Sequence, residues 1–276
     1  GLNTPGAVFD REWQRKVEES IARTVHEDDT GASTKDHTLV DTITAAEVQA
    51  AAKELSNGKA CGRDGLPSEF LQYGGNDMME SLALLFDKFR SSERTPHNWH
   101  LVNIVPIFKK GDKYNRANYR RVSLLSCVYK LYTRVLQRRL SAFLREHIVE
   151  EQAGFSEGKG CDDNLCIMTE VIERKVANRE ALYIALVDMR AAFDTVWRDG
   201  LWLKLQAMGV PHKLIRILRE IYSHGKFRVV ANGEEGADEE AVTAGVLQGD
   251  VLSPDLFKVF INDLHQFLAG AGCTGV

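Results

Sequence analysis

The order of hydrophobic and polar positions predicts a chain of helices interrupted by a few short strands. Apolar residues recur at helical spacing in four segments, which are 9–25, 76–91, 126–147 and 162–178. The T-x-x-E pattern from Thr44 to Glu47 predicts the start of a further helix. Continuous or alternating apolar runs predict strands at 101–108, 181–188, 226–231 and 240–244. We therefore expect a mixed α and β protein.

The segments between these elements have the composition of loops and turns. Residues 26–40 are polar and small and predict a linker, and residues 151–160 predict a glycine-rich loop. Two short helices should follow the second strand, split at the Gly-Val-Pro sequence of residues 209–211. An acidic turn containing Asn-Gly should join the last two strands. Ser253 and Pro254 suit the first turn of a final helix.

The stretch A-L-Y-I-A-L-V-D-M-R-A-A-F-D-T-V-W at 181–197 has the clearest chemical pattern of the chain. Its apolar run is typical of a strand buried on both faces, and the run ends on Asp188. A carboxylate at the end of a buried strand usually emerges at a surface or cleft, because an ionised Asp is rarely buried without a partner. Asp188 could hold Mg²⁺, which prefers oxygen ligands, or could cap the next helix.

The net charge of −4 argues against a nucleic-acid partner, but the distribution of charge argues for one. Between residues 109 and 145 the single acid is Asp112. The basic residues of this window are Lys109, Lys110, Lys113, Arg116, Arg120, Arg121, Lys130, Arg134, Arg138, Arg139 and Arg145. A local basic stripe is the pattern expected for phosphate contacts, although a solvated helix face would look the same.

The cysteines, the apolar runs and the start of the chain indicate in which cellular environment the protein is expected. The five cysteines are Cys61, Cys127, Cys161, Cys166 and Cys273. They include no C-x-x-C spacing, so we expect unpaired thiols in a reducing compartment and not a zinc site. No apolar run approaches the roughly 20 residues that span a bilayer, and no signal pattern opens the chain. We expect an intracellular protein, or an excised piece of a larger one, without a membrane partner.

Three features now need one explanation: a basic loop, a strand-end Asp, and a Gln-Gly loop before a helix. Nucleotidyl transfer requires such a set. Two metal ions, held about 3.5–4 Å apart, clamp the attacking and leaving oxygens. Cations balance the triphosphate charge, and a glycine loop allows close approach to base and sugar.

Six sequence motifs, in their order and in their residues, resemble those of the reverse transcriptases of non-LTR (LINE-type) retrotransposons. The resemblance runs from about Ile43 to Leu268. Its phrases are G-K-A-C-G-R-D-G-L-P-S-E-F-L at 58–71, V-P-I-F-K-K-G-D at 105–112, N-Y-R-R-V-S-L-L-S at 118–126, E-Q-A-G-F at 151–155, V-D-M-R-A-A-F-D-T-V at 187–196, and G-V-L-Q-G-D-V-L-S-P-D-L-F at 245–257 followed by I-N-D-L at 261–264. Telomerase and group II intron relatives are a second possibility within this class of enzyme, with a less similar wording.

The resemblance implies an α+β fold of the right-hand polymerase type, helix-rich with a small antiparallel sheet. Residues 1–40 would be an N-terminal helix and linker. Residues 41–180 would be fingers with an N-terminal extension. Residues 181–276 would be part of a palm.

The resemblance also implies roles for individual residues. Asp188 would be the catalytic aspartate and would hold Mg²⁺, or Mn²⁺ in its place, with the carbonyl of Met189 as a further ligand. Phe193 would exclude a 2′-hydroxyl, unless it is a plain core residue, and Asp194 would support the site. The nucleotide would be bound by Lys110, Arg120, Phe193, Gln248 and Gly249. Nucleic acid would be bound by Lys59, Arg63, Lys109, Arg116 and Lys159, with Lys109 and Arg116 also alternatives at the triphosphate. The Gly-Arg-Asp-Gly loop could equally be a structural turn.

The sequence departs from the family pattern in several places. The family continues after I-N-D-L to a hairpin with F/Y-A-D-D, which carries its other catalytic aspartates, and then to a thumb. The sequence ends at Val276 before such a motif, so we expect this chain to be inactive as a polymerase by itself. Cys61 and Arg121 stand where the family usually has Pro. Ser156 and Lys159 stand where Arg is usual, which weakens the expected phosphate contacts.

Three hypotheses follow for the function. The first is an RNA-directed DNA polymerase domain that uses an RNA template, a DNA primer and deoxynucleoside triphosphates. In the complete element an endonuclease domain would lie upstream, and the protein would act in the nucleus and cytoplasm. The second is a non-catalytic RNA- or DNA-binding remnant of such an element. The third is a structural protein with an accidental basic stripe, which the salt dependence of RNA binding would reveal.

Overall fold

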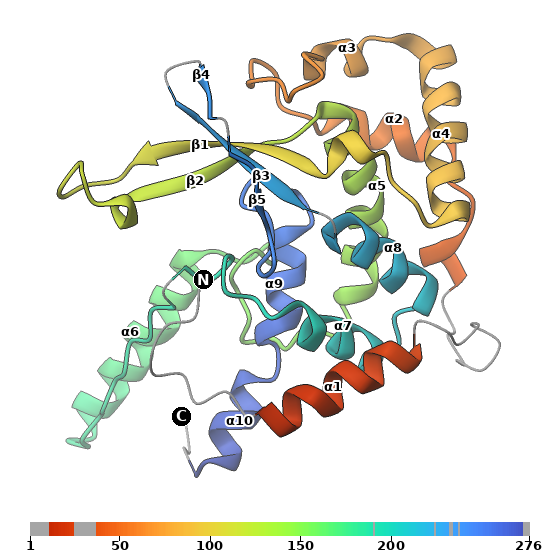
Figure 1. Cartoon of the computed structure of the whole chain (residues 1–276). Helices are drawn as coiled ribbons and strands as arrows, with labels where there is room; N and C mark the ends of the chain where they lie inside the picture. The colour runs from red at the N-terminus through yellow and green to blue at the C-terminus, as the bar shows by residue number, and fades with distance from the viewer. Residues whose placement is uncertain are drawn as a thin grey trace.

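The computed structural model describes residues 11–24, 37–189, 191–223, 225–231, 234–236 and 238–272. The helices of this part of the chain are α1 (Arg11–Thr24), α2 (Ala45–Lys53), α3 (Ser68–Gln72), α4 (Gly75–Ser92), α5 (Cys127–Leu144), α6 (Cys161–Ala177), α7 (Arg198–Ala207), α8 (His212–Ser223), α9 (Ser253–Ile261) and α10 (Leu264–Gly270). The strands are β1 (Leu101–Phe108), β2 (Tyr119–Leu124), β3 (Lys226–Ala231), β4 (Glu234–Glu235) and β5 (Glu240–Ala241). Short 3-10 turns are η2 (His37–Val40), η3 (His97–Trp99) and η4 (Arg116–Asn118). The predicted α+β class is confirmed (Figure 1).

Most of the predicted helices and the first strand lie where the pattern placed them. β1 has the predicted bounds, and the helices predicted at 76–91, 126–147 and 162–178 are α4, α5 and α6. Thr44 begins α2 with both halves of the capping box, because its hydroxyl accepts from the Glu47 amide and its own amide donates to the Glu47 carboxylate. Most of the predicted linker lies outside the described residues, and its last four residues form η2.

The predicted small sheet is present, but it is mixed, so the prediction of an antiparallel sheet is wrong only for the pairing of β1 with β3. Its strands follow the order β2–β1–β3–β4, and β5 also pairs with β3. β1 and β2 form an antiparallel hairpin, whereas β1 and β3 run parallel. A parallel pair needs a long crossover, and the helices α5 to α8 supply it between the two strands. β2, at the edge of the sheet, includes the end of the predicted basic loop, and charged residues are common on edge strands.

The predicted strand over 181–188 is also wrong for this structure. Residues 181–189 belong to no helix or strand, and the side chains of Tyr183 and Leu186 are 94% and 90% exposed. The segment returns beside α6, which has no buried residue (Figure 1). A buried strand requires neighbouring strands for its amide and carbonyl groups, and no strand among the described residues pairs with this one. The segment is apolar in sequence, but most of its side chains are exposed in this structure.

Helix α5 is the centre of the hydrophobic core. Its buried face packs against α2, α3, α9 and η2, and the core forms one cluster that extends from Val17 to Val259. In the first half of α5, the ring of Tyr132 lies tilted against the rings of Phe86 and Trp99. Because one cluster joins the segments before and after residue 180, the predicted domain division at that point stays a prediction. None of the helices in the described ranges has the length and apolar character that a membrane crossing requires.

Arg139 connects α5 to the start of α2 through a nearly buried guanidinium group. Its Nε and Nη2 atoms lie 2.7 and 2.9 Å from the two carboxylate oxygens of Glu47. Its remaining donors reach the carbonyl oxygens of Asp41 and Thr42. Burial alone would raise the pKa of Glu47, but Arg139 and the Thr44 amide and hydroxyl lower it overall. The planar fork of an arginine is needed for this set of bonds.

We therefore expect Arg139→Lys to lower the free energy of unfolding by about 1.5–3 kcal/mol, because lysine cannot make the bidentate contact. Arg138→Lys is the matched control. The side chain of Arg138, the residue before Arg139, is 45% exposed and pairs with Glu54. That surface pair contributes about 0–1 kcal/mol. Urea unfolding of both variants measures the difference, and equal losses would contradict the assigned role of Arg139.

Candidate functional site

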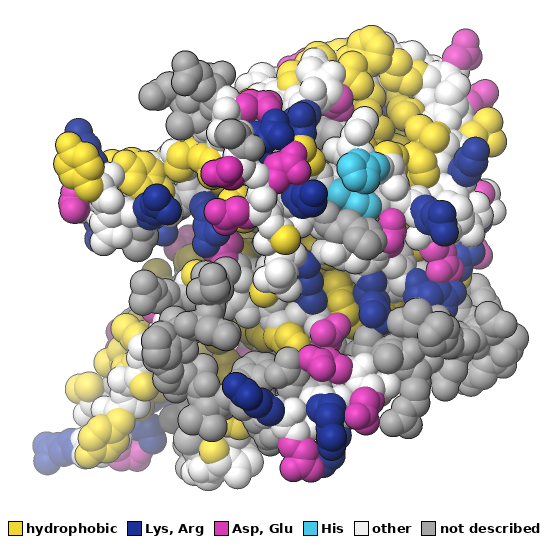
Figure 2. Space-filling view, in the orientation of Figure 1, with side chains coloured by type: hydrophobic (Ala, Val, Ile, Leu, Met, Phe, Trp, Pro, Cys, Tyr) yellow, Lys and Arg dark blue, Asp and Glu magenta, His cyan; other side chains and the backbone are white. Residues whose placement is uncertain are grey.

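The hairpin of β1 and β2 carries a cluster of basic residues that have no acidic partner among the described residues. Apart from Arg121, which pairs with Asp194, its exposed cations are Lys109, Lys110, Lys113, Arg116 and Arg120. None of them forms an ion pair with another described residue. The one nearby acid, Asp112, accepts a hydrogen bond from the Tyr114 amide at 2.9 Å. The hairpin projects from the body of the molecule, and Figure 2 shows dark blue side chains along this projection. It is therefore the strongest candidate surface for phosphate groups.

The helical half of the basic stripe differs, because its arginines are neutralised. Arg134 and Arg138 both pair with Glu54, and Arg139 pairs with Glu47. Arg145 lies 2.5 Å from the carboxylate of Glu157. These residues line a broad groove of about 1230 Å³ along α5, together with Lys159, whose ammonium donates to the carbonyl of Glu150. The basic stripe of the sequence thus divides into an uncompensated hairpin and a compensated helix face.

The loop at 244–250 is connected to β2 and to the segment that follows Asp188. The Ser123 amide donates to the Gln248 carbonyl at 3.1 Å. The Val246 amide donates to the Phe193 carbonyl, and the Gly245 amide donates to the Val196 carbonyl, both at 2.8 Å. Gln248 and Gly249 themselves are exposed. The backbone therefore places the predicted nucleotide-binding pair between the base of the hairpin and residues 193–196.

A half-buried arginine, Arg198, holds this loop in position. The guanidinium of Arg198 donates to the carbonyl oxygens of Gly245, Tyr222 and Val242 at 2.8, 2.6 and 2.9 Å, and to Ala244 at 3.4 Å. It also lies over the Tyr222 ring. Burial lowers the pKa of Arg198, since the charged form loses solvation. The sequence did not single out Arg198. Its only local signal is a cation directly after the apolar residues Val196 and Trp197, and such a pattern is common in proteins.

The last residue of the same loop, Asp250, has a buried carboxylate. Asp250 Oδ2 accepts hydrogen bonds from the hydroxyls of Tyr129 and Tyr222 at 3.1 and 2.8 Å. Ser253 joins this cluster and donates to the Leu247 carbonyl at 2.7 Å. Burial raises the pKa of Asp250, although both tyrosine hydroxyls act in the opposite direction. Sequence reasoning missed this cluster because its members come from α5, α8 and the start of α9.

The predicted catalytic and metal-binding residues lie at the surface. Asp188 and Met189 are exposed at the end of the segment 181–189. Among the described residues no three His, Cys, Asp or Glu side chains lie close enough to hold a metal ion together. Asp188 therefore belongs to no such group among the described residues, and its role stays a prediction.

Phe193 and Asp194 are both placed next to elements of the site. The Phe193 ring is half buried and lies 5.2 Å from the Phe257 ring and 6.0 Å from the Phe155 ring. The packing against Phe257 is that of a residue at the core edge, so selection against a 2′-hydroxyl stays a prediction. Asp194 Oδ2 lies 3.5 Å from Nη2 of Arg121, so the departure from the family's usual Pro adds an ion pair between β2 and residue 194.

The Gly-Arg-Asp-Gly loop is a structural turn in its glycine and aspartate positions. Asp64 accepts a hydrogen bond from the hydroxyl of Ser126, which begins α5. A Cβ atom on Gly62 would meet the backbone of Ser126 at 2.5 Å, so only glycine fits there. Lys59 and Arg63 remain exposed on this loop. Gly62 and Asp64 therefore have structural contacts in this loop, and nucleic-acid contact by Lys59 and Arg63 stays a prediction.

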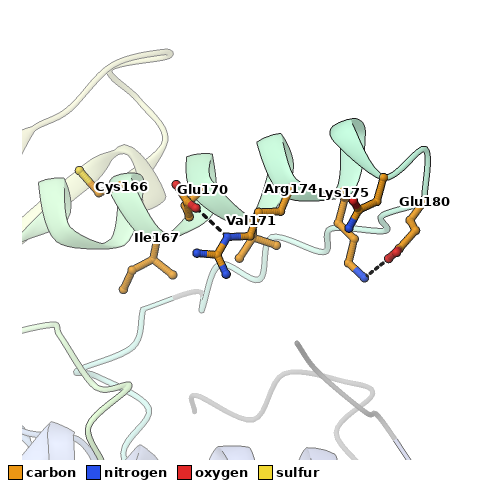
Figure 3. A pocket seen from close by; sticks show the side chains of 8 residues that line it. Cys166, Ile167, Glu170, Val171, Arg174, Lys175 and Glu180 are labelled. Carbon is orange, nitrogen blue, oxygen red and sulfur yellow. Dashed lines mark hydrogen bonds and ion pairs between the residues drawn. The ribbon is translucent and has the colours of Figure 1, made fainter.

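A shallow pocket on α6 does not belong to this site. Cys166, Ile167 and Val171 line it together with charged residues (Figure 3). Arg174 pairs with Glu170 and Lys175 pairs with Glu180, both at 2.6 Å. Its charges are satisfied within the pocket, so it shows no preference for a ligand.

The comparison with protein families gives one match over most of the chain. The family described as reverse transcriptase (RNA-dependent DNA polymerase) matches residues 107–274. This range includes the hairpin tip, the segment of Asp188 and the loop of Gln248. It begins after the first half of β1 and leaves out α1 to α4.

Three fruit-fly proteins illustrate the relatives, all from Drosophila melanogaster. A probable RNA-directed DNA polymerase from transposon BS is 29% identical over 225 residues, which is 80% of this chain and 25% of the relative. The RNA-directed DNA polymerase from mobile element jockey is 28% identical over 80% of this chain and 24% of the relative. A probable RNA-directed DNA polymerase from transposon X-element is 29% identical over 76% of this chain and 23% of the relative. The chain thus spans about a quarter of the length of these relatives.

Gly245 tests the connection between the loop and residues 193–196. Its φ is +83°, and a Cβ atom would lie 2.6–2.7 Å from the Asp194 and Phe193 carbonyl oxygens. Gly209 has a similar φ of +90° with no atom within 4 Å of a Cβ. We expect Gly209→Ala to cost about 1 kcal/mol of stability and Gly245→Ala about 1–3 kcal/mol more, because of the added overlap. Thermal or urea unfolding measures both, and equal costs would show that the two segments are not in tight contact.

Proposed function

This chain belongs to the reverse transcriptase family, and from this premise we propose that it binds template and nucleotide within an RNA-directed DNA polymerase of a non-LTR retrotransposon. Its partners would be an RNA template, a DNA primer and deoxynucleoside triphosphates. An endonuclease domain in the same polyprotein is part of this proposal, as is action in the nucleus and cytoplasm. The division into an extension with fingers (41–180) and palm (181–276) is proposed on the same basis.

The observation that supports the proposal is the uncompensated charge of the hairpin next to the loop of Gln248. Five exposed cations extend from the end of β1 to the start of β2 without an acidic partner among the described residues. The opposite end of β2 donates from Ser123 to the Gln248 carbonyl. A phosphate-binding arm is therefore joined to a glycine-containing loop, which is the arrangement that a polymerase needs for a charged substrate.

We assign the proposed roles as follows. Lys110 and Arg120 would balance the triphosphate charge, and Gln248 and Gly249 would lie against the incoming nucleotide, with Phe193 beside its sugar. Contacts to the nucleic-acid backbone would come from Lys59, Arg63, Lys109, Arg116 and Lys159. These cations come from the loop before α3, the hairpin and the loop before α6, so the proposed path crosses several elements.

The residues described here do not by themselves fit a metal centre. Asp188 and the carbonyl of Met189 would be two oxygen ligands, but within the described ranges Asp188 belongs to no group of three or more Asp, Glu, His or Cys residues that could hold a metal ion. Mg²⁺ or Mn²⁺ is proposed because polymerase chemistry uses such ions. We derive no step of the reaction through the ion.

The basic hairpin gives a prediction about salt dependence. Lys109→Ala and Arg116→Ala should each reduce the magnitude of the log–log salt slope for single-stranded RNA binding by about 0.7, because each removes one phosphate contact. Arg138→Ala is the control, since Arg138 already pairs with Glu54 and should leave the slope unchanged. Fluorescence anisotropy of a labelled RNA at several salt concentrations is the measurement. Binding that does not depend on salt would refute the proposed interface.

The catalytic assignment gives a second prediction. In a preparation whose wild-type form extends a DNA primer on RNA, Asp188→Asn should abolish extension and leave RNA affinity nearly unchanged. Asp194→Asn is the comparison, because Asp194 is proposed only to support the site and should retain part of the activity. Primer extension with deoxynucleoside triphosphates measures both. Substantial extension by Asp188→Asn would remove Asp188 from the catalytic group.

A further inference from the structure

The tip of the β1–β2 hairpin presents one aromatic side chain to solvent. Tyr114 is 96% exposed, although a tyrosine usually buries most of its ring. Single exposed apolar residues are normal, so exposure alone assigns no role. The neighbours of Tyr114 distinguish it, because Lys113 precedes it and Arg116 lies two residues later. Figure 2 shows hydrophobic and basic side chains together at the end of this projection.

The loop that carries Tyr114 is held by its own hydrogen bonds. Asp112 is the central residue: its carboxylate accepts from the Tyr114 amide at 2.9 Å. Its carbonyl accepts from the Asn115 amide at 3.2 Å and from the Asn118 side chain at 2.9 Å. The Tyr119 hydroxyl donates to the Lys113 carbonyl at 2.9 Å. The ring is thus presented by an ordered turn, and less entropy is lost when a ligand packs on it.

The charges around the ring indicate which ligand fits. Lys110, Lys113 and Arg116 are exposed and have no acidic partner among the described residues. The carboxylate of Asp112, the acid nearest in sequence, accepts a hydrogen bond from the Tyr114 amide. An aromatic face flanked by free cations matches an unpaired base with phosphates on either side. In a duplex the base faces are already stacked on each other, so a duplex offers phosphates but no free base face.

We propose that Tyr114 is a base-stacking residue for single-stranded nucleic acid, with adjacent phosphates on Lys113 and Arg116. The inference rests on the proposed function, since it presumes that the hairpin binds the template. It adds a residue that contacts a base to a surface otherwise assigned to phosphate groups. The hairpin would then prefer the unpaired part of a template over a duplex.

The experiment compares Tyr114→Ala and Tyr114→Phe with wild type in binding a short labelled uridine oligonucleotide and its fully abasic counterpart. Tyr114→Ala should weaken binding of the uridine strand about five-fold to hundred-fold, and Tyr114→Phe should bind like wild type. The salt slope should stay unchanged in both variants, because no charge is lost. Tyr73→Ala is the matched control, since Tyr73 is also largely exposed but lies at the end of α3.

The abasic strand separates stacking from every other effect of the substitution. Wild type should bind it about as weakly as Tyr114→Ala binds the uridine strand, and Tyr114→Ala should bind it no more weakly than wild type. An unchanged affinity of Tyr114→Ala for the uridine strand, or an equal loss for both strands, would overturn the proposal. If salt-dependent RNA binding persists in that case, the proposed function stands and stacking alone fails. If wild type shows no salt-dependent binding, both fail.

Discussion

The position of the loop at 244–250 depends on the guanidinium group of Arg198. This side chain, at the start of α7, donates to the carbonyl oxygen of Tyr222 at the end of α8. It also donates to the carbonyl oxygens of Val242, just before the loop, and Gly245, within it. Carbonyl groups at such a junction have no strand or helix partner of their own, and without Arg198 they would be left unsatisfied in a buried place. A charged donor with a rigid fork can satisfy several of them at once, which a lysine could not. The exposed side chain of Gln248 and the exposed Gly249 are therefore presented by a framework of backbone and buried polar contacts, to which Gln248 adds its carbonyl oxygen.

The other connections of the loop follow the same principle, because they are also made by the backbone or by buried polar groups. Ser123 connects it to β2, Phe193 and Val196 connect it to the segment after Asp188, and the tyrosine hydroxyls around Asp250 connect it to α5 and α8. These contacts place the predicted nucleotide-binding residues Gln248 and Gly249 beside the base of the hairpin, and they do not depend on the side chains of those two residues. A site of this type tolerates change at exposed positions and is sensitive at Gly245, Arg198 and Asp250, where a buried group or a close backbone contact would be lost.

Those parts of the fold that depend on local pattern could be predicted from the sequence. The bounds of β1, the capping box of Thr44 and the helical face of α5 each follow from spacing within a few residues. The strand predicted at 181–188 failed because burial depends on neighbouring strands, which a local pattern does not contain. The parallel pairing of β1 with β3 joins residues more than a hundred positions apart, and the hydrogen bonds of Arg198 and Asp250 join three elements each. Such contacts have no signal in the order of polar and apolar residues.

The basic stripe shows the same limit for the candidate site. Eleven cations in a window with one acid predicted a nucleic-acid surface, but a count along the sequence cannot tell which of them meet acids from elsewhere in the fold. Glu47, Glu54 and Glu157, which lie outside the window, neutralise the arginines of α5, and Asp194 meets Arg121. The other cations of the hairpin keep their charge for a ligand because the hairpin projects from the body, where few acidic side chains can reach it (Figure 2). The shape of the fold, and not the number of basic residues, therefore decides where this chain can attract phosphate.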